Sequence, residues 1–430
     1  MVHRIISWSL RNRFTVLTIA SVFFIWGIIN VRKNPVDAIP DLSENQVIVF
    51  TEWMGRAPQL IEDQITYPLV TNLQGLPGIQ YVRGTSMFGM SFIYVIFEDD
   101  IDIYWARSRV LERLSTVSQG LPPGVTPQLG PDGTGVGHVL WYTLDAPGMD
   151  LGELRAIQDW YVKFALQNVG GVSEIASFGG FQKQYAITIN PDKLLYYKVS
   201  VNDVINAIRS NNNEGGGRKL EMSDIGYIIK TSGYLQSRQE IEQIAVKNTQ
   251  GIAIKVNDIA TVQMTGEPRL GIFDQDGEGE KVGGIVVMRY KENAAAVIQG
   301  VKAKMKEVAK GLPQGVKFDI IYDRGELIKE TISSVRTTLI EEMIVVSLIV
   351  IIFLFHWRSA LSILIQIPVT IAISFILLNA FHISSNIMSL TGIALAIGVI
   401  VDNGIIMSEN AYKHLSEKYH QWLKEQTVHK

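Results

Sequence analysis

The sequence predicts a polytopic α-helical membrane protein that carries a large α+β domain outside the membrane. Three observations support this fold class. Of the 430 residues, 47% are hydrophobic and only 19% are charged, which is a high apolar share for a soluble chain. The apolar residues gather in four long runs. Residues 32–338, which separate the first run from the other three, have an ordinary composition and contain a repeated pattern.

The four apolar runs predict membrane-spanning helices at 14–31, 343–355, 360–381 and 387–407. Each run except the second is long enough to cross roughly 30 Å of hydrocarbon as a helix. The second run becomes long enough if Glu341 and Glu342 lie among the lipid headgroups. The first run is longer than the apolar core of a signal peptide, and no small-residue cleavage site follows it. We therefore expect the first run to remain as a span.

The positions of Lys and Arg predict the orientation of these spans, because positive charges near span ends favour the cytoplasm. The charges that place both termini in the cytoplasm are Arg4, Arg11 and Arg13 before the first span, Arg358 after the second, and Lys413, Lys418, Lys424 and Lys430 after the fourth. Arg32 and Lys33 lie on the opposite side and disagree with this orientation. We assign residues 1–31 to the cytoplasmic N-terminus and first span, 339–408 to the other three spans, and 409–430 to a cytoplasmic tail.

The segment between the first and second spans contains a duplication. Gly120-Leu-Pro-Pro-Gly-Val125 is echoed by Gly311-Leu-Pro-Gln-Gly-Val316, and a strand and an amphipathic helix precede each copy. This order indicates ferredoxin-like βαββαβ units. We assign 32–135 to the first unit and 136–178 together with 273–338 to a second unit, which an insert at 179–272 divides.

Charge, cysteine content and motifs exclude several classes of protein. A net charge of −3 argues against nucleic-acid binding, since such proteins usually carry a basic surplus. The chain has no cysteine, which excludes disulfides, thiolate metal sites and cysteine nucleophiles. No Gly-x4-Gly-Lys-Ser/Thr motif is present, so nothing in the sequence indicates ATP hydrolysis.

Several separate motifs resemble the N-terminal half of a resistance-nodulation-division (RND) transporter of the heavy-metal efflux branch. The similar segments are Pro35-Val-Asp-Ala-Ile-Pro-Asp-Leu-Ser43, Tyr104-Trp-Ala-Arg-Ser-Arg-Val-Leu-Glu112, Leu129-Gly-Pro-Asp-Gly-Thr-Gly-Val136 and the fourth span from Asn386 to Ala411. The fourth span is most similar to the monovalent-metal, Cus-type members rather than the divalent Czc type. The resemblance implies that the complete family chain is about twice as long as this one and has twelve spans.

The resemblance implies a secondary active transporter rather than an enzyme. It implies a homotrimer in the bacterial inner membrane, with residues 32–338 forming a periplasmic porter domain and its docking-type insert. A periplasmic adaptor protein and an outer-membrane channel would be its partners, together with the missing C-terminal half of the chain. The expected activity is proton-driven antiport of heavy-metal cations, Cu(I) or Ag(I), with no resident cofactor. We expect that these 430 residues do not transport alone.

Asp402 is the strongest candidate site, because an ionised side chain within a span costs roughly 2.5–3.5 kcal/mol and is usually kept for ion movement. The resemblance assigns it proton uptake and release; a structural Asp held by a Lys is the alternative. Helical spacing places Met388 and Glu409 within about 40° of Asp402 on one face. Glu409 is either a second relay carboxylate or an interfacial residue. Met388, and Met407 on another face, are either transit ligands for a soft cation or packing residues.

Two departures from the family pattern keep other functions open. The first is length, because the family chain is about twice as long as these 430 residues. The second is methionine content, because Ile400 and Pro268 occupy positions where a copper or silver pump would be expected to carry methionine. A divalent-metal exporter or a drug exporter of the same superfamily therefore remains an alternative. A truncated half-protein that does not transport is the third hypothesis.

Overall fold

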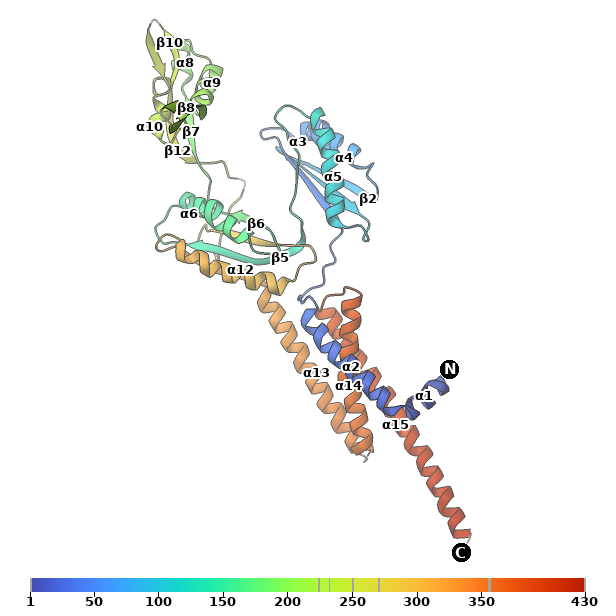
Figure 1. The fold of residues 1–430 in the computed structure, drawn as a ribbon. Helices are drawn as coiled ribbons and strands as arrows, with labels where there is room; N and C mark the ends of the chain where they lie inside the picture. Colours follow the sequence, from blue (N-terminus) through green and yellow to red (C-terminus); the bar gives the residue numbers. More distant parts are fainter. Residues whose placement is uncertain are drawn as a thin grey trace.

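The computed structural model describes residues 2–222, 225–231, 233–249, 251–269, 271–354 and 357–428. The molecule is elongated, with a bundle of helices at one end and units of mixed helix and strand at the other (Figure 1). Residues 355 and 356, which belong to the predicted second span and the loop after it, and 429 and 430 of the predicted tail lie outside the described residues.

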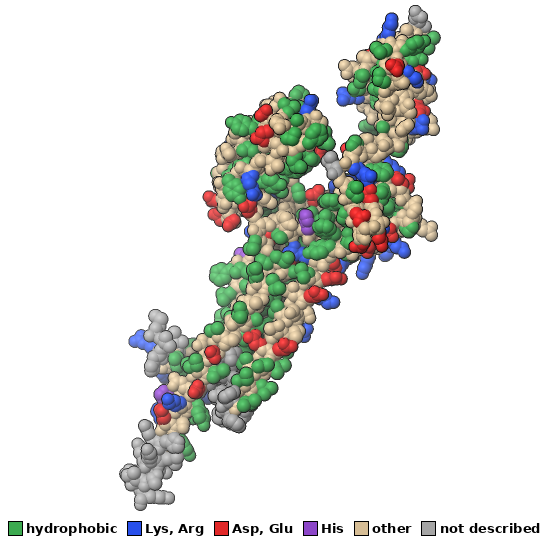
Figure 2. All heavy atoms as spheres, turned by 180° about the vertical axis from the view of Figure 1, so that it is seen from behind, with side chains coloured by type: hydrophobic (Ala, Val, Ile, Leu, Met, Phe, Trp, Pro, Cys, Tyr) green, Lys and Arg blue, Asp and Glu red, His purple; other side chains and the backbone are tan. Residues whose placement is uncertain are grey.

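The helical bundle is formed by both ends of the chain. Its helices are α1 (Val2–Arg11), α2 (Arg13–Lys33), α13 (Arg324–Leu354), α14 (Trp357–Ala380) and α15 (Ile387–Val428). Among the described residues, α2 and the 387–419 part of α15 are long and apolar enough to cross a membrane, and the apolar part of α14 is shorter. Hydrophobic side chains cover much of the bundle surface, whereas Lys, Arg, Asp and Glu are denser on the sheet units (Figure 2). The predicted boundaries at 338 and 408 fall inside continuous helices, α13 and α15.

Helices α2 and α14 cross at very short distance because Gly27 has no side chain. A Cβ atom at Gly27 would lie 2.4 Å from the Cβ of Ala372 and 2.5 Å from its carbonyl oxygen. Gly27 and Ala372 are both buried. The glycine therefore decides how closely the first helix of the bundle approaches α14.

The first sheet unit is a four-stranded antiparallel sheet covered on one face by helices. Its elements are β1 (Gln46–Glu52), α3 (Pro58–Ile61), the π-turn η1 (Glu62–Thr66), α4 (Tyr67–Leu73), β2 (Ile79–Met87), β3 (Met90–Phe97), α5 (Ile103–Val117), η2 (Ser118–Gly120) and β4 (Gln128–Leu129). The strand order is β2-β3-β1-β4. Side chains of β1 alternate, with Val47 and Val49 fully buried against the helices. Asp102 caps α5 by accepting a hydrogen bond from the Trp105 amide.

The second sheet unit has the same strand order, although its halves are far apart in the sequence. Its elements are β5 (Gly133–Asp145), α6 (Leu151–Ile157), the π-turn η3 (Gln158–Val162), α7 (Lys163–Gln167), β6 (Val172–Phe178), β13 (Val282–Arg289), α12 (Ala294–Val308), η4 (Ala309–Gly311) and β14 (Lys317–Asp323). The order β14-β5-β13-β6 corresponds to β4-β1-β3-β2 of the first unit. The α+β content predicted from the sequence is confirmed.

A third unit lies between β6 and β13 in the chain and projects from the second sheet unit (Figure 1). Its elements are β7 (Lys183–Ile189), α8 (Pro191–Tyr197), α9 (Val201–Asn211), β8 (Gly215–Met222), β9 (Ile225–Thr231), α10 (Arg238–Glu242), β10 (Ala245–Thr249), β11 (Ile252–Lys255), α11 (Val256–Ile259) and β12 (Ala260–Gly266). The entering strand β7 pairs with the leaving strand β12 over seven register positions. Val204, Val256 and Val262 belong to a core of its own.

We predict that Gly27→Leu destabilises the bundle. The new side chain meets the backbone of Ala372, which cannot rotate away, so we expect a loss of at least about 1–3 kcal/mol. The thermal midpoint of the detergent-purified protein measures this loss. Val22→Leu, on the exposed side of the same helix, is the matched control and should leave the midpoint unchanged. Equal midpoints for the two variants would show that α2 and α14 do not depend on this close approach.

Candidate functional site

Helix α15 carries the residues that the sequence singles out. Asp402, Met388 and Glu409 are all exposed, and so are the residues between them on the same face, Thr391, Leu395, Val399 and Ile406. The opposite face packs inside the bundle, where Ile397 is 2% exposed and contacts residues of α13 and α14 through a small apolar core. The helix therefore buries one face and leaves the Asp402 face open within the described chain.

No described residue forms an ion pair or hydrogen bond with the carboxylate of Asp402. Gly392 and Gly398 of α15 also have no neighbour where a side chain would lie, because a Cβ atom at either position would meet nothing within 4 Å. A helix that packs on the Asp402 face would have to come from outside the residues described here.

The two candidate thioether ligands lie far apart. Met388 and Met407 are separated by roughly 28 Å along the helix axis and by about 100° around it. Both side chains are largely exposed, at 66% and 60%. Within the parts of the chain that the structure describes, no three His, Asp or Glu side chains are grouped so that they could hold a metal ion. Each methionine would thus need ligands from elsewhere to bind a cation.

Hydrogen bonds between two segments that are distant in the sequence hold the N-terminal end of α15, and the sequence did not predict them. Residues 34–38, which follow α2, lie beside residues 383–387, which precede α15, and we call these two segments the clasp. The Ser385 amide donates to the Pro35 carbonyl at 2.9 Å, and the Asp37 amide donates to the Ser385 carbonyl at 3.1 Å. The Asn34 side-chain amide donates to Ser385 Oγ at 2.8 Å. These bonds join the segment that follows α2 to the segment that precedes α15.

Asn386 fixes the first turn of α15 to the clasp. Its Oδ1 accepts hydrogen bonds from the amides of Met388 and Ser389, both at 3.0 Å, as an N-cap residue does. Its Nδ2 donates to Ser384 Oγ at 3.1 Å. Asn386 is only 4% exposed, so no bulk water replaces these partners. The orientation of α15 is thereby tied to the loop that the clasp holds.

A buried ion pair connects the clasp to the second sheet unit. Arg324, the first residue of α13, places its Nε 2.8 Å from Asp37 Oδ1, and its side chain is 4% exposed. Its guanidinium also donates to the carbonyl of Val136 on β5 and, at 3.5 Å, to that of Ile39. Burial raises the pKa of Asp37, while the Arg324 charge and the Ala38 amide lower it in part. One guanidinium thus bridges α13, β5 and the segment after α2.

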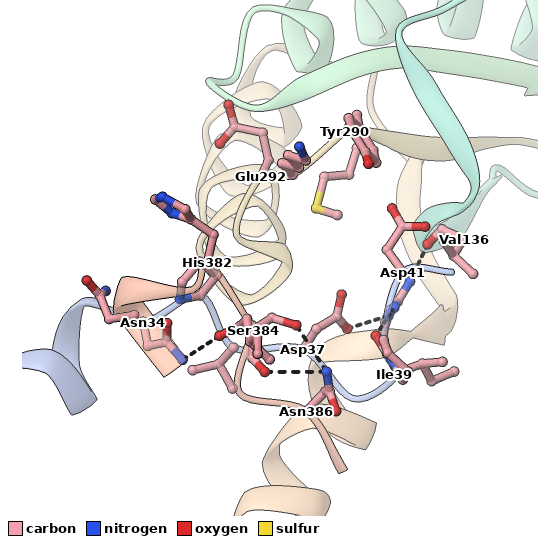
Figure 3. Close-up of a pocket in the computed structure, with 18 of the residues that line it drawn as sticks. Asn34, Asp37, Ile39, Asp41, Val136, Tyr290, Glu292, His382, Ser384 and Asn386 are labelled. Atoms are coloured by element: carbon pink, nitrogen blue, oxygen red, sulfur yellow. Dashed lines mark hydrogen bonds and ion pairs between the residues drawn. The ribbon is translucent and has the colours of Figure 1, made fainter. Parts of the chain in front are cut away.

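A cavity of about 760 Å³ lies beside this ion pair. Figure 3 shows that its labelled residues come from several segments: Asn34, Asp37, Ile39 and Asp41 after α2, Val136 on β5, Tyr290 and Glu292 between β13 and α12, and His382, Ser384 and Asn386 before α15. Asp41, Glu292 and His382 border it with titratable groups. The cavity therefore opens where the bundle and the second sheet unit meet.

Sequence reasoning missed this junction because its partners are distant in the chain. Asn34 and Ser385 are separated by 351 positions, and no local pattern indicates that they touch. One signal was nevertheless available, because the segment Pro35–Ser43 already stood out as a motif.

The architecture defines the class of protein. A solved structure of a heavy metal efflux pump, crystal form II, matches with a TM-score of 0.85 and 32% sequence identity, over 95% of this chain and 41% of the pump chain. The model of the AcrB/AcrD/AcrF family, which comprises RND transporters, matches residues 5–430. The chain belongs to this family, and the resemblance noted from the sequence is confirmed.

Two curated relatives narrow the comparison. Cation efflux system protein CusA of Escherichia coli (strain K12) is 45% identical over 424 residues, which are 98% of this chain and 40% of CusA. Cobalt-zinc-cadmium resistance protein CzcA of Cupriavidus metallidurans is 35% identical over 425 residues, 97% of this chain and 40% of CzcA. The chain thus spans 40% of the length of these relatives.

We predict that Asn386→Ala weakens the attachment of α15. Loss of an N-cap costs about 0.5–2 kcal/mol, and the side-chain bond to Ser384 is lost as well. The thermal midpoint in detergent reports this loss. Asn386→Ser retains an N-cap oxygen and should lose less. If both variants melt together with the unmodified protein, the cap does not hold α15.

Proposed function

We propose that this chain is part of a proton-driven exporter of heavy-metal cations in the bacterial inner membrane. The observation that carries the proposal is Asp402, which lies in the apolar part of α15 on a face that no described residue covers. A carboxylate in that setting suits proton uptake and release, since the cost of keeping it ionised without a partner is high. The relatives named cation efflux and metal resistance proteins support the choice of cargo.

We propose that the cationic partner of Asp402 comes from a segment outside this chain. The exposed Asp402 face and the 40% coverage of the relatives both support this arrangement. Glu409 lies on the same face, about two turns further along α15, and would extend the proton path towards the cytoplasm. The assembly would be a homotrimer whose large units lie in the periplasm, joined by an adaptor protein and an outer-membrane channel. The metal ion is the cargo, and no resident cofactor is required.

We propose Cu(I) or Ag(I) as the cargo, because the candidate ligands Met388 and Met407 are thioethers, which favour soft cations. Divalent ions are the alternative, which the relation to CzcA keeps in view.

We expect Asp402→Asn in the complete pump to lower metal-driven proton exchange by more than about tenfold, because the amide cannot take up and release a proton. The signal of a pH-sensitive dye on adding metal to inverted vesicles, into which an exporter would load the metal, measures this effect. Asn403→Ala, at the neighbouring position of the same helix, is the control and should transport normally. Full transport by Asp402→Asn would refute the proton relay. The 430 residues reconstituted alone are expected to transport nothing.

We expect the gene to protect cells from copper and silver more than from zinc, cobalt or cadmium. Growth inhibition by each metal, with and without the complete gene, measures the selectivity. Met388→Leu preserves size and removes the thioether, so it should reduce protection against copper and silver selectively. Protection against zinc, cobalt or cadmium alone would show that the cargo is divalent.

A further inference from the structure

The chain passes between the bundle and the sheet units twice, at residues 34–45 after α2 and at the start of α13. Both passages meet at the clasp and Arg324. Ala38 is 2% exposed and belongs to the core of the second sheet unit, with Val139 of β5 and Ile328 of α13. The segment that holds the N-terminal end of α15 is therefore itself packed into the core of the second sheet unit.

The junction resists separation because its polar groups are buried and paired. Asn34 and Ser385 are 3% and 4% exposed, and the Asn34 side-chain amide donates across the clasp to Ser385 Oγ and to the Ile383 carbonyl. Opening the clasp would leave these groups without partners, which proteins rarely tolerate. A displacement of the outer end of α15 must then move residues 34–38 with it.

We propose that Arg324, paired with Asp37, is a positioning residue that transmits movement of α15 to the second sheet unit while the clasp stays closed. This inference rests on the proposed function, and it adds that α15 moves as Asp402 gains and loses a proton. Asp402 lies roughly 24 Å along the helix from Asn386, so a rigid helix carries its shift or tilt to the clasp. Arg324 then passes it to β5 through Val136 and to the first turn of α13.

The test replaces the ion pair with an apolar pair of similar size in the complete pump. Arg324→Met or Asp37→Leu alone leaves one buried charge unpaired and should lower the thermal midpoint. Asp37→Leu/Arg324→Met removes both charges, and we expect the midpoint to recover while cation efflux stays at least about tenfold below that of the unmodified pump. Efflux that recovers with the midpoint would show that the pair only stabilises the fold, and would overturn the proposal.

The exposed pair Arg83–Glu44, at 3.0 Å on the first sheet unit, provides the matched control. Glu44→Leu/Arg83→Met makes the same chemical change away from the junction and should keep efflux within about twofold. The Asp402→Asn variant, measured in parallel, separates failure of the proposed function from failure of the positioning role. If the unmodified pump moves no cation, or if Asp402→Asn transports normally, the proposed function fails; normal transport by the Asp37/Arg324 double variant alone defeats only the positioning role.

A disulfide across the clasp tests its closure independently of the ion pair. These 430 residues contain no cysteine, so Asn34→Cys/Ser385→Cys introduces one defined pair into this part of the pump, at side chains in contact, and the unmodified pump is labelled in parallel as the control. Thiol labelling measures the fraction that is oxidised. Because the clasp is proposed to move as a closed body, oxidation should leave efflux within about twofold of the reduced form of the same variant. Efflux that stops on oxidation and returns on reduction would mean that the clasp must open, and would overturn the proposal.

Discussion

The junction of this molecule depends on the buried ion pair between Arg324 and Asp37. Removing a guanidinium and a carboxylate from water costs several kcal/mol for each ion, so the pair is tolerated only where geometry and further hydrogen bonds compensate. The carbonyls of Val136 and Ile39 supply that compensation. A single side chain consequently requires α13, β5 and the segment after α2 to meet at one point. The clasp contains Asp37, and the cavity beside the ion pair is also lined by Asn386, the N-cap residue of α15.

Helix α15 shows the opposite situation at Asp402. Its inner face is satisfied by apolar packing, as Ile397 shows, whereas the face with Asp402 has no counterpart in the described chain. A carboxylate can remain there only if another segment covers it or if water reaches it. The polar groups at the N-terminus of α15 therefore have partners within the described chain, whereas the carboxylate of Asp402 has none. This asymmetry is what makes the Asp402 face the site of interest.

The third unit illustrates how a fold accepts a large insert. Strands β6 and β13 are antiparallel neighbours in one sheet, so the two ends of the insert start close together. The pairing of β7 with β12 continues that proximity into the insert. Little loop-closure entropy is then lost when a folded unit replaces a turn. The second sheet unit keeps the topology of the first even though its sequence is divided.

The sequence by itself determined the elements and the place of the charge that matters most. Apolar runs indicated α2 and α15, and the repeated loops, each preceded by a strand and an amphipathic helix, indicated both sheet units. Asp402 stood out because an ionised group is costly within an apolar run. Only the tertiary structure decided the contact of Gly27 with Ala372, the clasp between Asn34 and Ser385, and the pairing of Arg324 with Asp37. Periodicity shows which face of an element is buried, but the identity of the partner follows from packing between segments hundreds of residues apart, which local sequence does not encode.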